Sequence, residues 1–252
     1  MELMNNITNT ELASILALNN DDFSKYFDLA NKIREKNVGD IIHIRALLEF
    51  SNHCKRQCLY CGLNCKNTSV KRFRLTPEEI INLAIEAHNV GYKTIVLQSG
   101  EDAFYTTKIL SEIVKEIKKT GLFVTLSCGE MSYKDYEILK ESGTDRYLLK
   151  HETSNEISYK KLHPDSDFKT RKKCLKNLKE IGFETGGGFM IGLPEQTLLD
   201  IANDLLLLKE IGCDMAGIGP FISNPDTQLK GCPCGDTDLT LRVVALARIL
   251  LP

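Results

Sequence analysis

Four of the nine cysteines lie within twelve residues, and their spacing is the clearest chemical signal in the chain. Cys54, Cys58 and Cys61 form the pattern Cys-x3-Cys-x2-Cys, and Cys65 follows. Thiols clustered in this way in a reducing compartment favour metal binding over disulfides. On a four-iron cluster, three thiolates leave one iron without a protein ligand, and such an open position separates a reacting metal from a structural one.

A zinc knuckle or a group of surface thiols is the alternative interpretation. A zinc site requires a second ligand pair at matching spacing, and only Cys65 lies close enough in the sequence to contribute. Cys232 and Cys234 are expected to be a pair of loop thiols. Three more cysteines are expected to be small core residues: Cys128, Cys174 and Cys213.

The elements that must position these thiols are strands alternating with helices. Residues 10–37 are expected to be helical, and the first strand, 41–50, ends just before the cysteines. Later helices end at glycines suited to left-handed caps: Gly91, Gly121, Gly143, Gly182 and Gly212. Short, nearly continuous apolar runs follow them, typical of buried parallel strands, at 94–98, 123–127, 146–151, 183–191 and 215–221.

This repetition predicts an α/β fold, a TIM-like parallel β/α barrel with six strand–helix units. Residues 1–39 are expected to be an N-terminal helical extension, and residues 40–252 the barrel core. A closed barrel has eight units. The count therefore predicts either an open barrel or a chain that lacks the last two units and is incomplete at its C-terminal end.

Composition and charge restrict the function. The net charge of −2 gives no overall field for nucleic acid. No apolar run approaches the roughly 18 residues of a membrane span, and residues 1–10 lack the features of a signal peptide. We expect a cytoplasmic protein that binds neither nucleic acid nor membrane.

The cysteine pattern, with an aromatic residue before its third member, resembles the radical S-adenosylmethionine (SAM) superfamily. The resemblance implies a 4Fe–4S cluster on Cys54, Cys58 and Cys61, whose open iron chelates SAM. Three further segments match the superfamily in order along the chain. Ser99-Gly100-Glu101-Asp102 resembles the motif that receives the SAM amino group, and Gly186-Gly187-Gly188 resembles the glycine-rich strand beside SAM. Gly217-Ile218-Gly219 resembles the segment beside adenine. Glycine in such a strand lets the backbone approach a ligand.

Several segments look like the HydE type of this superfamily, the maturases of FeFe-hydrogenase: Tyr60-Cys61-Gly62-Leu63, Leu97 to Asp102, Thr125 to Glu130, and Tyr147 to Thr153. The family implies a small organic or organometallic substrate, an electron donor such as a ferredoxin or flavodoxin, and other hydrogenase maturation proteins as partners. One alternative is a biotin-synthase-like or methylornithine-synthase-like enzyme acting on an organic substrate. A non-catalytic iron–sulfur carrier is the alternative from another class.

By position in the family, Glu152 and Arg171 would bind the methionyl part of SAM, and Thr125 would line the cavity near it. A carboxylate suits the ammonium of SAM, and a guanidinium suits its carboxylate. The alternatives are an ion pair between Glu152 and Lys150, and a solvated charge for Arg171 on its lysine-rich helix. The sequence departs from the family at Lys150, often arginine, and at Glu195, commonly glycine.

Overall fold

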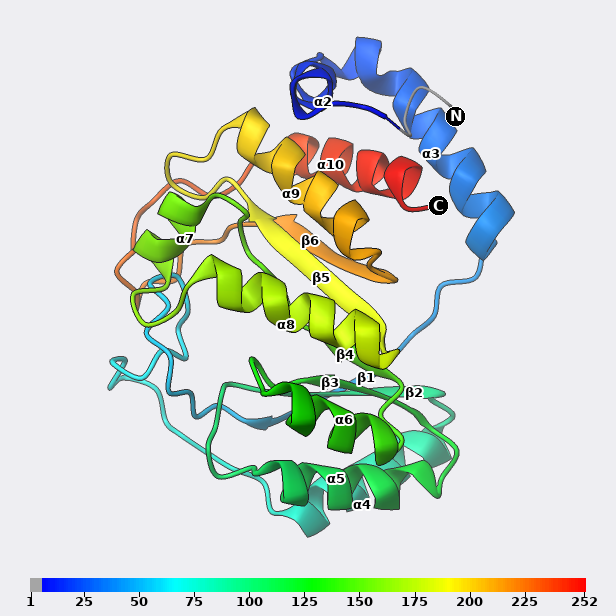
Figure 1. Cartoon of the computed structure of the whole chain (residues 1–252), viewed down its shortest axis with the longest axis vertical. Helices are drawn as coiled ribbons and strands as arrows, with labels where there is room; N and C mark the ends of the chain where they lie inside the picture. Colours follow the sequence, from blue (N-terminus) through cyan, green and yellow to red (C-terminus); the bar gives the residue numbers. More distant parts are fainter. Residues whose placement is uncertain (1–5) are drawn as a thin grey trace.

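The structure is a computed structural model that describes residues 6–252, and its centre is one parallel sheet (Figure 1). The six strands follow one another in chain order, with β1 and β6 at the edges. They are β1 (Ala46–Ser51), β2 (Thr94–Ser99), β3 (Phe123–Ser127), β4 (Arg146–Leu148), β5 (Glu184–Ile191) and β6 (Met215–Pro220). The predicted six-unit parallel α/β architecture is confirmed as an open sheet.

A helix follows every strand. These helices are α4 (Pro77–Val90), α5 (Thr107–Lys118), α6 (Tyr133–Glu141), α7 (Glu156–Leu162) with α8 (Phe168–Ile181), α9 (Leu198–Ile211) and α10 (Thr237–Leu250). Two more helices, α2 (Asn9–Leu16) and α3 (Asn20–Val38), precede the sheet and pack on α9 and α10 respectively. The first five residues of the expected 1–39 extension lie outside the described residues.

The helix boundaries follow the local sequence signals. Thr76 and Glu79 form a reciprocal capping box at the start of α4, where Pro77 occupies the first helical position. Gly182 ends α8 in the left-handed conformation that a residue without Cβ adopts at little cost. Asn19 caps α3, which divides the expected helical stretch into two helices.

Two strands are shorter than their apolar runs predict. The first begins at Ala46 rather than at residue 41, and Ile41 and Ile42 are 78% and 86% exposed. The fourth ends at Leu148, although the N–H groups of Leu149 and His151 still donate to β5 carbonyls, and Glu152 has a φ of +64°. Beyond that point one isolated bridge, between Glu152 and Phe189, continues the pairing with β5. The candidate site residue Glu152 therefore lies just beyond the regular part of β4.

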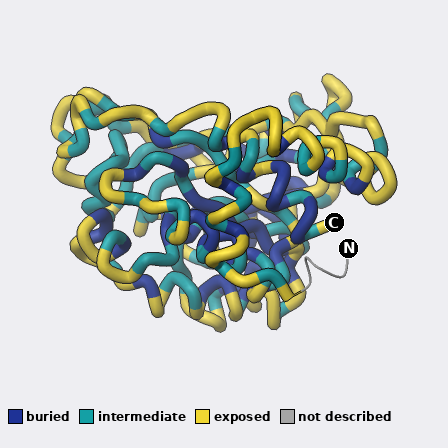
Figure 2. The backbone as a smooth tube through the Cα atoms, turned by 90° about the horizontal axis from the view of Figure 1, so that it is seen from above, coloured by how far each residue is buried: buried dark blue, intermediate teal, exposed yellow. Residues whose placement is uncertain are grey.

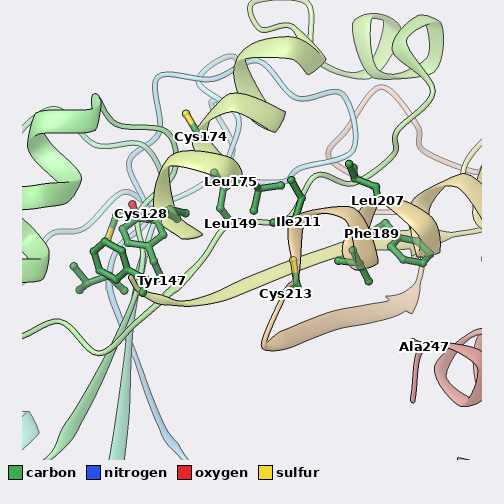
Figure 3. Packing of buried hydrophobic residues seen from close by; sticks show 14 of the residues in the cluster. Cys128, Tyr147, Leu149, Cys174, Leu175, Phe189, Leu207, Ile211, Cys213 and Ala247 are labelled. Carbon is green, nitrogen blue, oxygen red and sulfur yellow. The ribbon is translucent and has the colours of Figure 1, made fainter. Parts of the chain in front are cut away.

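The hydrophobic core lies between the sheet and its helices. Buried and exposed backbone separate clearly in Figure 2, where the outer turns of the chain are exposed. Cys128, Cys174 and Cys213 are buried within this core, as predicted (Figure 3). Among residues 6–252, no helix combines the length and the apolar character that crossing a bilayer requires.

Candidate functional site

The cysteine loop, residues 52–76, runs from the end of β1 to the start of α4, without regular secondary structure. It lies at the carboxyl edge of the sheet, where the loops of β/α barrels carry their chemistry. Cys54, Cys58 and Cys61 are partly buried, whereas Cys65 is exposed. The structure therefore separates the three thiols of the predicted cluster from the fourth.

Arg72, which the motifs did not single out, fixes the shape of this loop. Its guanidinium donates hydrogen bonds of 2.5 to 3.1 Å to four backbone carbonyls, those of Asn52, Leu63, Asn64 and Asn67. These carbonyls lie on both sides of the three cysteines in the sequence. One partly buried side chain thus holds the two ends of the cysteine segment together.

The backbone around Cys54 suits a negatively charged sulfur, whereas burial favours the neutral thiol at Cys58. The backbone N–H groups of Arg56 and Glu101 both donate to the Cys54 sulfur at 3.4 Å, and such bonds tune iron–sulfur centres. Burial raises the pKa of the Cys58 thiol to about 12, and the nearby Cys61 and Cys54 thiols add to the shift. Because iron binds thiolates, loading the site must release protons. Three thiols in one braced loop fit the group that the family implies.

A single zinc ion and a four-iron cluster place different geometric demands on the thiols. In the part of the chain that the structure describes, no three His, Cys, Asp or Glu side chains are arranged to hold a single metal ion. A four-iron cluster differs, because each thiolate binds its own iron.

Gly100 brings the end of β2 against the cysteine loop. A Cβ placed on Gly100 would lie 2.3 Å from the carbonyl oxygen of His53 and 2.6 Å from the Cβ of Cys54. Both contacts are far inside van der Waals distance, and the carbonyl belongs to the backbone. Glycine at this position is therefore what allows the first cysteine to sit over β2.

We expect Gly100→Ala to displace the loop and lower the free energy of unfolding by about 1–3 kcal/mol, the usual cost of overpacking. Iron bound after anaerobic reconstitution should fall with it. Gly219→Ala is the matched control, because no atom lies within 4 Å of the position that a Cβ on Gly219 would take. Full iron content and unchanged stability in Gly100→Ala would contradict the packing argument.

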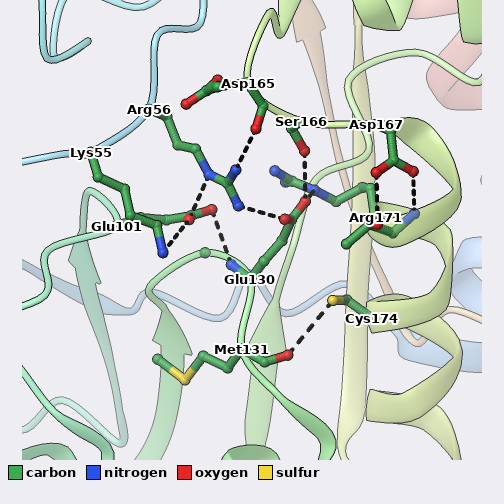
Figure 4. A network of polar contacts seen from close by, with 12 residues as sticks. Lys55, Arg56, Glu101, Glu130, Met131, Asp165, Ser166, Asp167, Arg171 and Cys174 are labelled. Carbon is green, nitrogen blue, oxygen red and sulfur yellow. Dashed lines mark hydrogen bonds and ion pairs between the residues drawn. The ribbon is translucent and has the colours of Figure 1, made fainter.

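A buried chain of alternating charges crosses the site beside the loop (Figure 4). Arg56 donates to the carboxylates of Glu101 and Glu130 at 2.6 Å each, and Arg171 donates to the other oxygen of Glu130, also at 2.6 Å. The Glu101 and Glu130 side chains are 8% and 7% exposed. Glu130 thereby links the β2 side of the site to α8, a role that the sequence motifs did not reveal.

Arg171 is not a solvated charge on a lysine-rich helix. Its side chain is 11% exposed, and a second N–H donates to the carbonyl oxygen of Lys150 at 2.8 Å. The helix thus buries an arginine among lysines, because this side chain points toward the ends of the strands.

Glu152 and Thr125 each present a buried polar atom without a hydrogen bond. Thr125 is 2% exposed and its hydroxyl has no hydrogen-bond partner, and the same holds for one carboxylate oxygen of Glu152. That oxygen lies 3.2 Å from the Lys150 ammonium, so the predicted alternative ion pair is present. Because buried polar groups left unsatisfied are rare, the Thr125 hydroxyl is available to a ligand, whereas the Glu152 oxygen already has an ion-pair partner.

The glycine-rich strand allows close approach between β5 and β6. Gly188 has a φ of +155°, and a Cβ there would lie 2.2 Å from the carbonyl oxygen of Gly217. Its own carbonyl accepts hydrogen bonds from the N–H groups of His151 and Glu152. Ile218 pairs in register with Phe189 and packs against the hydrophobic core.

Glu195, where the family commonly has glycine, has a φ of +63°.

His163 supports the aromatic residue before the third cysteine. The Nδ1 atom lies 3.0 Å from the carbonyl oxygen of Tyr159, so Nδ1 carries the proton, and Nε2 accepts from the Tyr60 hydroxyl at 2.9 Å. The His163 ring also stacks on the Tyr159 ring. Burial lowers the pKa of His163 to about 4, so the imidazole is neutral near pH 7.

This burial predicts a pH dependence of stability. Below the ordinary pKa near 6.5, the unfolded chain binds a proton at His163 that the folded chain does not bind until about pH 4. Stability is therefore lost as the pH falls, by about 2 kcal/mol from this group between pH 7 and pH 5. Unfolding in urea at the two pH values should show a smaller difference in His163→Gln than in the wild-type protein. If the stability difference between pH 7 and pH 5 were equal in the two proteins, this role of His163 would be contradicted.

Comparisons with known proteins come from sequence and from structure. The family model described as Radical SAM superfamily matches residues 48–208. The [FeFe] hydrogenase maturase subunit HydE of Thermotoga maritima is 55% identical over 97% of this chain and 71% of its own length. The 3-methylornithine synthase of Methanosarcina acetivorans is 27% identical over 98% and 71%. The crystal structure of methylornithine synthase (PylB) superposes with a TM-score of 0.88 at 25% identity, covering 99% of this chain and 75% of its own.

Proposed function

The chain belongs to the radical SAM superfamily, in its HydE type, and from that premise we propose that it takes part in maturation of FeFe-hydrogenase. The observation that carries the proposal is the 55% identity to a HydE maturase over nearly the whole chain. The cysteine loop, at the carboxyl edge of the parallel sheet, is where the chemistry of this family would take place. The protein is a radical SAM enzyme.

Within this function, we assign Cys54, Cys58 and Cys61 as ligands of a 4Fe–4S cluster. When bound, the cluster supplies one electron to the sulfonium of SAM, whose carbon–sulfur bond breaks to give methionine and a 5′-deoxyadenosyl radical. The protein side of this chemistry is positional. Arg72 holds the loop that carries the thiols, and His163 holds the Tyr60 ring next to Cys61.

The methionyl group of SAM is assigned to the charged side chains beside the loop. The Arg171 guanidinium would donate hydrogen bonds to the SAM carboxylate, and Glu130 would hold that guanidinium in position. Glu152, with one oxygen lacking a hydrogen bond, would receive the SAM ammonium together with the Gly100-Glu101 segment. The Thr125 hydroxyl, which has no hydrogen-bond partner among the described residues, would form a hydrogen bond with SAM. Gly188 and Ile218 would line the side toward adenine.

The division of the chain follows from the same proposal. Residues 40–252 would form the β/α core that carries the site, and residues 1–39 a helical extension. Its helices α2 and α3 pack on α9 and α10, away from the cysteine loop. We propose a cytoplasmic protein, because a cluster of free thiols needs a reducing compartment.

The substrate is proposed to be a small iron- or sulfur-containing precursor of the hydrogenase metal centre, with further maturation proteins as partners. A methylornithine-synthase-like or biotin-synthase-like enzyme acting on an organic substrate is the second candidate, favoured by the TM-score of 0.88 to PylB. The identity of 27% to 3-methylornithine synthase, against 55% to HydE, places it second.

An activation assay separates the two candidates. Apo-hydrogenase should gain activity in an anaerobic mixture of the other maturation proteins only when the reconstituted chain is added. The same mixture with the Cys58→Ala variant should stay inactive. Activation without the wild-type chain, or none with it while SAM is being cleaved, would favour the organic substrate.

A further inference from the structure

The segment that carries the cysteines is strongly basic. Residues 50–77 contain six lysines and arginines and no aspartate or glutamate, although the whole chain has 32 basic and 34 acidic residues. The positive charge is thus concentrated at the loop that holds the thiols.

Acidic neighbours neutralise only part of this charge at the surface. Arg56 is partly buried against Glu101 and Glu130, and the Lys55 ammonium lies 3.6 Å from the Glu101 carboxylate. Arg74 pairs with Asp102, whose side chain is 2% exposed. Lys66 and Lys71 are exposed, and among the described residues neither side chain has a hydrogen-bonding or ion-pair partner. Solvent therefore meets the cations, while the carboxylates lie beneath them. We call Lys55, Lys66, Lys71, Arg72 and Arg74 the basic rim.

The basic rim borders a groove that reaches a candidate cluster ligand. The groove has a volume of about 350 Å³, and Cys54 and Cys65 lie in its wall beside Lys55, Arg72 and Arg74. Cys54 is the thiol that accepts two backbone N–H groups. The groove, whose wall also includes Glu101 and Asp102, thus gives solvent access to Cys54.

Two exposed aromatic residues lie beside the basic rim: Phe104 lines the groove, and Phe73 stands between Arg72 and Arg74 in the sequence. Phe73 is 40% exposed and Phe104 is 49% exposed, and the Arg74 guanidinium stacks over the Phe104 ring at 5.2 Å. Aromatic residues and arginine are enriched where proteins bind one another, and a charged rim around them steers the encounter. The surface has the composition of a docking face.

We propose that the basic rim is the docking face for an acidic one-electron carrier protein, seated over the groove at Cys54. The proposal rests on the proposed function, which requires one electron for each SAM cleaved. In the docked pair the carrier would lose one electron, and the cluster on the three thiolates would gain that electron. No bond or proton is exchanged. Opposite charge brings the carrier to this face from a distance.

The test reverses charge at two lysines that touch neither the thiols nor the ion network. In the holoenzyme, Lys66→Glu/Lys71→Glu should lower the second-order rate of cluster reduction by a reduced acidic flavodoxin by about tenfold or more at low salt. The wild-type rate should fall as salt is added, and the variant rate should change much less. Reduction by dithionite, a small reagent, should be the same in both proteins.

Lys32→Glu/Lys36→Glu is the matched control. It makes the same change of net charge on exposed lysines of α3, which lies on the other side of the molecule from the cysteine loop in Figure 1. Its reduction rate should equal that of the wild-type protein. Equal flavodoxin rates in all three proteins, equal losses in both double variants, or a wild-type cluster that the carrier cannot reduce would overturn the docking face. Absence of SAM cleavage with dithionite would instead count against the proposed function.

Discussion

Alanine at Cys54, Cys58 or Cys61 is expected to abolish both cluster binding and SAM cleavage. Each of these thiols is partly buried in the braced loop, and a cluster that loses one of only three protein ligands has no substitute nearby in the pattern. Iron and sulfide content after anaerobic reconstitution, together with 5′-deoxyadenosine formed from SAM, measure the two losses. They should occur together in all three variants.

Cys65→Ala is the matched control for these variants. Cys65 belongs to the same loop, but its side chain is exposed and lies outside the three-cysteine pattern. Its variant should bind iron and cleave SAM like the wild-type protein. Loss of the cluster in Cys65→Ala alone would show that the ligands have been assigned wrongly.

The second large effect is expected at Arg171. Replacing it with alanine would remove the proposed charge-assisted contact to the SAM carboxylate and should weaken SAM binding by about 2 kcal/mol or more. The protein should also lose stability, because Glu130 keeps only Arg56 as an ion-pair partner. That loss should stay below the roughly 3–5 kcal/mol of a buried charge left without any partner. Calorimetric titration with SAM and unfolding in urea measure the two effects.

Lys172→Ala provides the comparison on the same helix. Lys172 follows Arg171 directly, but its ion pair with Glu210 is partly exposed, so its removal should cost about 1 kcal/mol or less. Its affinity for SAM should remain that of the wild-type protein. An Arg171→Ala protein that is folded, contains its cluster and binds SAM normally would return Arg171 to a purely structural role.

The repeating pattern of the sequence was sufficient to predict the sheet. Glycines at helix ends and short apolar runs identified all six strands, since buried parallel strands leave a signal that is local in sequence. The same signal placed the end of β4 too late. Apolar side chains continue through Leu149, but the positive φ of Glu152 and its bridge to Phe189 depend on the neighbouring strand.

The candidate site leaves a sequence signal where one short motif contains it, and none where distant segments meet. The three cysteines are neighbours in sequence, so their spacing marks them as candidate ligands, and their assignment to a cluster stays a prediction. Glu130 bridges Arg56 and Arg171, residues 74 and 41 positions away, and no local pattern reports such a contact. Arg72 looked like one cation among several, because its role depends on carbonyl groups that carry no side-chain signature.

We propose that three cysteines of this chain hold a cluster that cleaves SAM reductively. The most direct measurement is anaerobic reconstitution with iron and sulfide, followed by addition of SAM and dithionite and quantification of 5′-deoxyadenosine and methionine. We predict that both products form in equal amounts, that they require the reductant, and that they vanish in Cys58→Ala but persist in Cys65→Ala. A reconstituted wild-type protein that binds iron yet forms neither product would contradict the account and identify a carrier rather than an enzyme.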